Sequence, residues 1–145
     1  MITEDYVSFE IAKLLKEKGF DEATYQFYKA IAYLGTEADD ICLKTMDSIK
    51  SEPFYNSYYG IDLHGEDTGE YACPTLQMVM KWLREVHSID ICIGKAGPKA
   101  YTALIVKNNI SYPYYPIKNK DAYQEFPLYE EACEAAIKYC LEHLI

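Results

Sequence analysis

Arginine is nearly absent from this chain of 145 residues: Arg84 is the only one, beside 13 lysines. The acidic residues number 23, so the formal net charge is −9 at pH 7. Proteins that bind DNA or RNA use clustered positive charge, and arginine is prominent among the residues that contact phosphates and bases. We therefore expect no direct binding of nucleic acid.

Long apolar runs and paired cysteines are also missing. No segment approaches the ~18 apolar residues of a membrane-spanning helix, and the polar, acidic N-terminus is unlike a secretory signal peptide. The five cysteines, at positions 42, 73, 92, 133 and 140, include no C-x-x-C pair, which argues against a disulfide framework or a structural zinc site. We expect a cytoplasmic protein with no membrane contact and no cofactor.

What the chain does contain is apolar and aromatic material: half of its residues are hydrophobic, and 15 are tyrosines. That is enough for one core, and the length suits a single domain spanning residues 1–145. The charge is unevenly distributed, because residues 1–72 hold 15 acidic and 6 basic residues whereas residues 73–145 hold 8 of each. An acidic half suits contact with a basic protein surface, or simply solubility.

Three segments have the apolar spacing of amphipathic helices. The first runs from Ser8, a good N-cap, to Lys18. Its polar face carries Lys13, Lys16 and Glu17. The second begins at Pro74, where a missing N–H is harmless, and extends to His87. The third, from Tyr129 to His143, has the most regular stripe, and we interpret its two cysteines, Cys133 and Cys140, as small core residues.

Segments rich in aromatic and β-branched residues predict the strands. Residues 23–29 favour a strand over a helix, and residues 36–50 form a weaker candidate for a fourth helix. From 51 to 71 the pattern dissolves into a long surface loop, with at most one short strand near 58–63. Further strands are predicted at 89–93, 101–107 and 112–117, the last at an edge because of its prolines.

This order of elements predicts an α+β fold. Consecutive strands with short links pair antiparallel, so we expect a small antiparallel sheet of three to five strands. Three or four helices would pack on it in a two-layer sandwich. The region from about 23 to 72 is acidic and rich in tyrosine, and we interpret it as variable.

Three stretches carry a resemblance: EDYVSFEIAKLLKEKGFDE from Glu4, CPTLQMVMKWLREVH from Cys73 and YEEACEAAIKYCLE from Tyr129. They resemble a group of small proteins of unassigned activity from Bacteroides phages, prophages and other mobile elements. The likeness covers the three predicted helices, about a third of the chain, and leaves residues 23–72 unmatched. It implies a mobile-element origin and transfers no activity and no catalytic residue.

Three short segments could carry chemistry, and each also has an ordinary structural interpretation. The segment from Asp62 to Asp67 holds one imidazole and three carboxylates, which could bind a metal or transfer protons; its glycine favours a solvated turn. The thiol of Cys73 lies before a helix N-terminus, which can lower a thiol pKa, but a buried structural cysteine is the simpler interpretation. The segment from Gly94 to Lys99 resembles a phosphate loop only in composition, and a hairpin turn explains it.

Tyrosine gives the strongest signal, because 15 hydroxyl groups exceed what one small core can satisfy. Exposed tyrosines beside polar loops are common at protein interfaces. The binding residues that we predict are therefore mostly in the middle region, with two lysines from the glycine-rich turn. They are Tyr55, Tyr58, Tyr59, Asp62, Glu66, Asp67, Lys95 and Lys99.

These residues favour a non-enzymatic binding module that docks on a host or phage protein, with counter-defence as one version of that role. The alternative is a binder of a small, nucleotide-like molecule that uses tyrosine stacking and the lysines of the turn. A small enzyme ranks third, because no catalytic motif is present. A homodimer is left open by the sequence.

Overall fold

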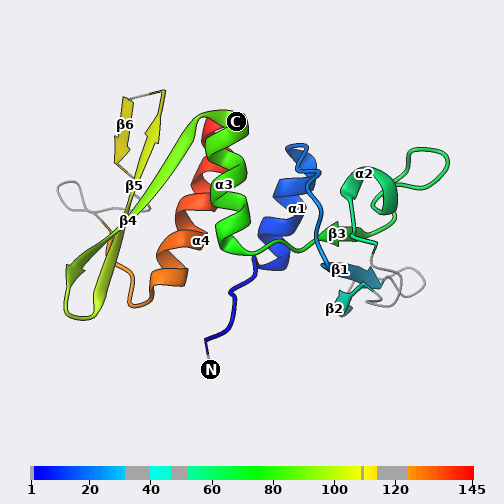
Figure 1. Cartoon of the computed structure of the whole chain (residues 1–145), viewed down its shortest axis with the longest axis horizontal. Coiled ribbons are helices and arrows are strands. Elements are labelled where there is room, and N and C mark those ends of the chain that lie inside the picture. The colour runs from blue at the N-terminus through cyan, green and yellow to red at the C-terminus, as the bar shows by residue number, and fades with distance from the viewer. Residues whose placement is uncertain (1, 32–39, 47–51, 109, 114–123) are drawn as a thin grey trace. The chain divides into compact units, whose positions relative to one another are not determined.

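The computed structural model describes residues 2–31, 40–46, 52–108, 110–113 and 124–145. The chain divides into two compact units, one formed by Tyr6–Pro74 and one by Met1–Asp5 with Thr75–Ile145. Figure 1 shows the elements of each. The interpretation of the whole chain as a single domain stays a prediction.

In the unit Tyr6–Pro74, helix α1 spans Phe9–Glu17 and confirms the first predicted helix. Ser8 caps its start, where the hydroxyl accepts a hydrogen bond from the Ile11 N–H at 3.4 Å. Gly19 follows the helix with a φ of +83°, a conformation that favours glycine. The apolar stripe is buried and consists of Ile11, Ala12 and Leu15.

The sheet of this unit has the strand order β2-β1-β3 and is antiparallel throughout. Strand β1 is Gln26–Ile31, β2 is Asp40–Thr45 and β3 is Glu70–Ala72. Phe9 on α1 packs edge-on against Tyr28 and Tyr71, with ring centroids 5.6 and 5.4 Å apart. Side chains alternate between the faces of a strand, so Phe27 points to the face opposite Tyr28.

The structure confirms the strand predicted at 23–29, in β1, but two other predictions for this unit are wrong. Residues 40–45 were expected in a helix and form β2, because antiparallel pairing with β1, a non-local contact, decides their conformation. A short helix, α2, occupies Asn56–Tyr59, where a loop or a strand was expected. The rest of 36–50 lies outside the described residues, apart from Met46.

In the other unit, helix α3 spans Leu76–His87, and α4 spans Tyr129–Tyr139 and continues as a π-helix, η1, over Cys140–Leu144. Both predicted helices are confirmed. Thr75 caps α3, its hydroxyl accepting from the Met78 N–H at 3.2 Å.

The second sheet is also antiparallel, in the order β4-β5-β6. Its strands are Ile89–Gly97, Ala100–Lys107 and Ile110–Pro113. The helices α3 and α4 lie side by side against it (Figure 1). The buried residues from the helices and strands form one core: Leu76, Val79, Trp82, Leu83, Ile89, Ala103, Ile105, Ala132, Cys133, Ala136, Ile137, Cys140 and Leu141.

The predicted α+β class and the antiparallel pairing are confirmed, with one difference: the strands in the described residues form two sheets of three instead of one sheet. Each sheet has its own helix partners, α1 for the first and α3 with α4 for the second. Of the strand predicted at 112–117, residues 112 and 113 belong to β6 and the remainder lies outside the described residues. No helix in the described part of the chain combines the length and apolar content needed to cross a membrane.

The side chain of Ile137 is fully buried in α4, so we predict that Ile137→Ala lowers the free energy of unfolding by roughly 2–5 kcal/mol. Urea denaturation followed by circular dichroism measures the loss. Val86→Ala on α3 is the control, because Val86 is exposed and such positions change stability by only about ±0.5 kcal/mol. Equal, small effects of both substitutions would contradict the packing described for α4.

Candidate functional site

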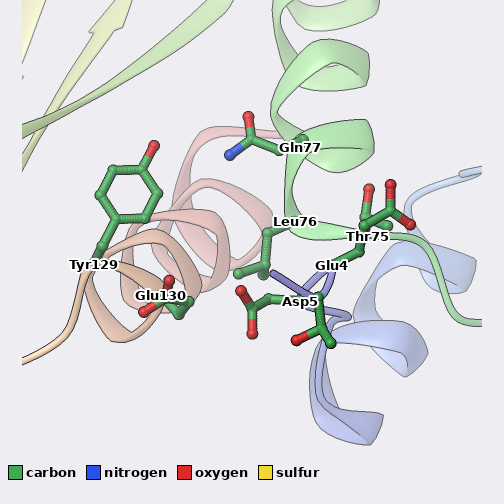
Figure 2. A pocket seen from close by; sticks show the side chains of 8 residues that line it. Glu4, Asp5, Thr75, Leu76, Gln77, Tyr129 and Glu130 are labelled. Carbon is green, nitrogen blue, oxygen red and sulfur yellow. The ribbon is translucent and has the colours of Figure 1, made fainter. Parts of the chain in front are cut away.

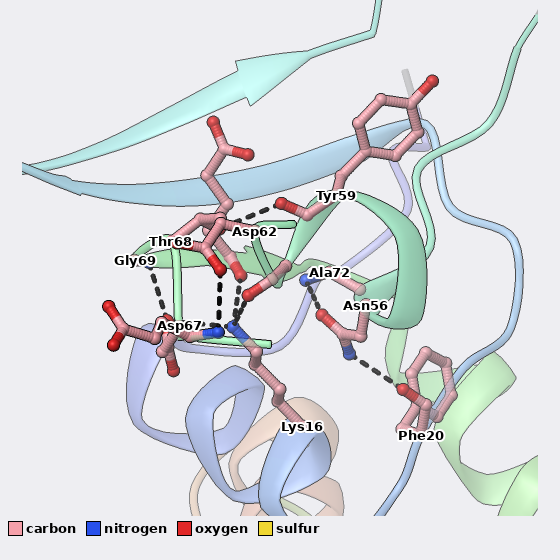
Figure 3. Close-up of polar contacts among 12 residues, drawn as sticks. Lys16, Phe20, Asn56, Tyr59, Asp62, Asp67, Thr68, Gly69 and Ala72 are labelled. Carbon is pink, nitrogen blue, oxygen red and sulfur yellow. Dashed lines mark hydrogen bonds and ion pairs between the residues drawn. The ribbon is translucent and has the colours of Figure 1, made fainter. Parts of the chain in front are cut away.

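The short helix α2 is positioned by its one buried polar residue, Asn56. The Asn56 Nδ2 donates to the backbone oxygen of Phe20 at 2.8 Å, and its Oδ1 accepts from the Ala72 N–H at 2.9 Å (Figure 3). A buried amide needs partners for both of its ends. Asn56 therefore ties α2 to the end of the α1 segment and to β3 at once.

The N-terminal end of α2 is capped by a residue from outside the helix, and its C-terminal end is followed by a glycine. Tyr55 occupies the N-cap but supplies no side-chain hydrogen bond; instead, the Ser57 N–H donates to the Asp21 carboxylate at 2.8 Å. At the other end, a Cβ on Gly60 would lie 2.5 Å from the Asn56 carbonyl oxygen. Only glycine fits there without a shift of the backbone.

Lys16 on α1 reaches the segment that follows α2. Its Nζ donates to the Gly60 carbonyl at 2.6 Å, to the Glu70 carbonyl at 3.0 Å and to the Asp67 carboxylate at 3.0 Å (Figure 3). It also lies 4.5 Å from the centroid of the Tyr71 ring. An ammonium group has three donors, and all three are used here. The side chain is only 12% exposed, so the polar face of α1, on which the sequence places Lys16, is covered at this position.

An aromatic column leads from the core of this unit to its surface. Phe27 stacks on the buried Phe54 with centroids 4.8 Å apart, and Phe54 stacks on Tyr59 at 5.5 Å. Tyr58 then meets Tyr59 edge-on, at 4.8 Å and an interplanar angle of 83°. The Tyr58 side of the column is open to solvent, with 74% of the residue exposed.

The outer end of this column lines an open depression of about 390 Å³. Its residues, which we call the tyrosine depression, are Glu52, Pro53, Tyr55, Ser57, Tyr58 and Tyr59. The Tyr59 hydroxyl donates to the Glu52 carboxylate at 3.3 Å. Desolvation of the phenol raises the pKa of Tyr59, and the charge and hydrogen bond of Glu52 raise it further. Tyr59 is therefore protonated at neutral pH and remains the donor.

A hairpin-like turn follows α2, closed by a bridge between Ile61 and Asp67. The Asp62 carboxylate accepts the N–H groups of His64 and Glu66 at 2.7 and 2.9 Å, which fixes the turn. Gly65 has a φ of +77°, as the predicted turn requires. Leu63, an apolar residue that the sequence did not mark as a binding residue, is fully exposed at the tip of the turn.

The predicted binding residues therefore separate into three groups. Tyr55, Tyr58 and Tyr59 meet in the tyrosine depression, as sequence composition suggested. The carboxylates of Asp62 and Asp67 hold their own segment together, whereas Glu66 is exposed and makes no side-chain hydrogen bond that the structure records. The two lysines belong to the other compact unit and are exposed in strand β4 and in the β4–β5 turn; they are Lys95 and Lys99.

Three of the described cysteines, Cys73, Cys133 and Cys140, are buried, whereas Cys92 is exposed. Cys73 is buried and donates through Sγ to the Val7 carbonyl at 3.7 Å, and burial raises the pKa of its thiol to about 11. The prediction of core cysteines at Cys133 and Cys140 is confirmed by their burial, which raises their pKa values to about 11 and about 12. Within the described residues, no group of three or more His, Cys, Asp or Glu side chains could hold a metal ion.

A second, smaller depression of about 280 Å³ lies within the other unit, at the first turns of α3 and α4 (Figure 2). Its lining joins three distant segments, and three of its eight residues are acidic: Thr3, Glu4, Asp5, Thr75, Leu76, Gln77, Tyr129 and Glu130. The Thr75 hydroxyl is engaged as the cap of α3, and Tyr129 hydrogen-bonds with Gln77. Glu130 lies in the first turn of α4, where a negative charge stabilises the helix.

Comparison of the chain with protein-family models, with curated proteins and with solved structures finds no match.

Removal of the Lys16 ammonium group should destabilise the unit Tyr6–Pro74. Lys16→Met would leave the Gly60 and Glu70 carbonyls without this donor and Asp67 without its ion pair, at a cost of about 1–3 kcal/mol in the free energy of unfolding. Urea denaturation measures it. Lys44→Met, at an exposed lysine on β2, is the matched control and should have little effect. A loss for Lys16→Met no larger than for the control would refute this account of the network.

Asp67 gives the network a pH dependence. Burial raises the pKa of its carboxyl group, but the Gly69 N–H and the hydrogen bond and charge of Lys16 outweigh burial, so the pKa is lowered from 3.8. A lowered folded-state pKa stabilises the protein above 3.8, and this contribution disappears as the pH falls through the folded value. We predict that Asp67→Asn is less stable than the unmodified chain at neutral pH and that the difference narrows towards about pH 2.

Denaturation curves measured over a pH series, with the difference between the two proteins as the readout, test this prediction. The pH-dependent contributions of the carboxylates that both proteins share cancel in that difference. Glu66→Gln serves as the control for removal of a charge from the same turn, outside the Lys16 network. The difference in free energy of unfolding between Asp67→Asn and the unmodified chain could instead stay constant or widen on acidification. That result would show that the ionised form of Asp67 does not stabilise the folded chain.

Proposed function

We propose that this protein is a non-enzymatic binding module that docks on another protein through the tyrosine depression. The observation that carries the proposal is the exposure of Tyr58, 74%, on a ring that packs against Tyr59 and through it against the buried Phe54. Interface hot spots are rich in tyrosine, which gains affinity when a partner desolvates it. An anchored ring also loses little conformational freedom on binding, which lowers the cost of association.

The turn after α2 supplies a second contact region of mixed character. Leu63 is fully exposed at its tip, and Asp62 and Glu66 beside it are exposed as well. The Thr68 hydroxyl donates to the Tyr59 carbonyl at 2.9 Å, so the base of the turn is attached to α2. An apolar residue between carboxylates combines desolvation energy with electrostatic steering.

The charge of the unit indicates which partners it attracts. Residues 6–74 contain 13 acidic and 6 basic residues, and a field of one sign accelerates encounters with surfaces of the opposite sign. A basic surface is therefore the proposed partner. We propose that this surface belongs to a host or phage protein in the cytoplasm, which the resemblance to mobile-element proteins supports, with counter-defence as one version of the role.

The small-molecule alternative combined tyrosine stacking with Lys95 or Lys99. The tyrosine depression is open, whereas sites for small molecules enclose most of the ligand surface. The shape of the depression therefore does not favour a nucleotide-like ligand.

Selection from a random peptide display library against the purified protein tests docking without knowledge of the natural partner. Enriched peptides should lose binding to the double variant Tyr55→Ala/Tyr58→Ala and keep binding to Tyr25→Ala, which removes an exposed tyrosine outside the depression. The unfolding temperature of the double variant should stay close to that of the unmodified chain.

Three results would overturn the proposal. The first is a set of enriched peptides that bind the double variant as well as the unmodified chain, and the second is no enrichment at all. The third is unfolding of the double variant, since Tyr55 and Tyr58 would then contribute to the core.

A further inference from the structure

We infer that the tyrosine depression receives an organic cation, the guanidinium or ammonium group of an arginine or lysine on the docking partner. The inference rests on the proposed docking function and names the chemical group that the site recognises. Its starting point is the lining, which combines three tyrosine rings with the Glu52 carboxylate and, among the described residues, contains no lysine or arginine. A cation over a tyrosine face is attracted by the ring's quadrupole.

The geometry suits such a group. Tyr58 and Tyr59 stand nearly perpendicular, at 83° with centroids 4.8 Å apart, so the two rings present differently oriented aromatic surfaces to the depression. Glu52 accepts the Tyr59 hydroxyl at 3.3 Å, which leaves its other lone pairs for a donor from the partner. The depression thus offers ring faces and a counter-charge together.

The same unit already contains a complete example of this arrangement. Tyr71 hydrogen-bonds with the Asp67 carboxylate, and the Lys16 ammonium lies 4.5 Å from the Tyr71 centroid and 3.0 Å from Asp67. There the chain supplies a tyrosine, a carboxylate and a cation. In the tyrosine depression it supplies the tyrosine–carboxylate pair, Tyr59 with Glu52, and none of the lining residues in the described part of the chain is a cation.

Other occupants fit less well. An anion would meet the Glu52 charge in a unit that is already acidic. A neutral apolar group could stack on the rings, but it would bury Glu52 without a charge partner, which costs free energy. A guanidinium or ammonium group satisfies the rings and the carboxylate at the same time.

The test uses peptides of four arginines, four lysines and four citrullines, titrated by isothermal calorimetry and by NMR of the purified full chain. Both cationic peptides should bind more tightly than the neutral citrulline peptide. Tyr58→Ala should weaken their binding roughly two- to fivefold, the size of one exposed cation–π contact. Tyr58→Phe keeps the ring face and should bind like the unmodified chain.

The charge is tested by a matched pair of variants. Glu52→Gln should weaken the binding of the cationic peptides more than Glu22→Gln, which removes the same charge from the same unit but does not line the depression. Equal effects of the two variants would show that only the overall negative charge attracts the peptides. Equal binding of the arginine and citrulline peptides, or no effect of Tyr58→Ala, would also overturn the inference.

The outcomes separate this inference from the proposed function. If displayed peptides require Tyr55 and Tyr58 but the citrulline peptide binds as well as the arginine peptide, docking stands and the cation site is wrong. If the cationic peptides depend on Tyr58 and Glu52 but no displayed peptide depends on the tyrosines, the cation site stands and docking on proteins fails.

Discussion

The ammonium group of Lys16 links α1 to three other parts of its unit: the end of α2, the turn that follows it and β3. It donates to two backbone carbonyls and one carboxylate and lies over a tyrosine ring. An ammonium group removed from water is stable only when its donors are satisfied. The contacts are therefore interdependent: the turn supplies acceptors that the lysine needs, and the lysine holds the turn.

The segment depends on this contact because it has little apolar core of its own. Between residues 55 and 69, only Asn56 and Gly60 are buried. Asn56 bonds to Phe20 and Ala72, and Gly60 accepts from Lys16. Polar contacts to the neighbouring elements, together with the stacking of Tyr59 on Phe54, thus hold α2 in place. Tyr58 can consequently remain exposed on a fixed backbone, which is what an interface anchor requires.

Local signals predicted much of the fold. The helices that begin after Ser8, near Pro74 and at Tyr129 combine caps with regular apolar spacing, and all three are present. Strand β2 was not predicted because its stability comes from pairing with β1. Such a contact cannot be inferred from the local sequence of the strand. Helix α2 was missed because four residues cannot show a helical period.

The site was predicted only in part. Composition pointed to Tyr55, Tyr58 and Tyr59, since tyrosines outside a periodic element have no pattern that buries them. The role of Lys16 was hidden because its spacing on α1 is that of a solvated residue, and its acceptors are more than 40 positions away in the sequence. Asp67 was assigned to binding for its charge, whereas the fold uses that charge for Lys16.

Native-state hydrogen exchange tests the central claim most directly, because the N–H groups of Tyr59, Gly60 and Thr68 bond to carbonyls within α2 and at its end. If Lys16 holds this segment in place, these three amides are protected in the unmodified chain. In Lys16→Met they lose protection together, while the amides of α4 keep theirs. Unchanged protection of the three amides in Lys16→Met, or its absence from the unmodified chain, would contradict the account.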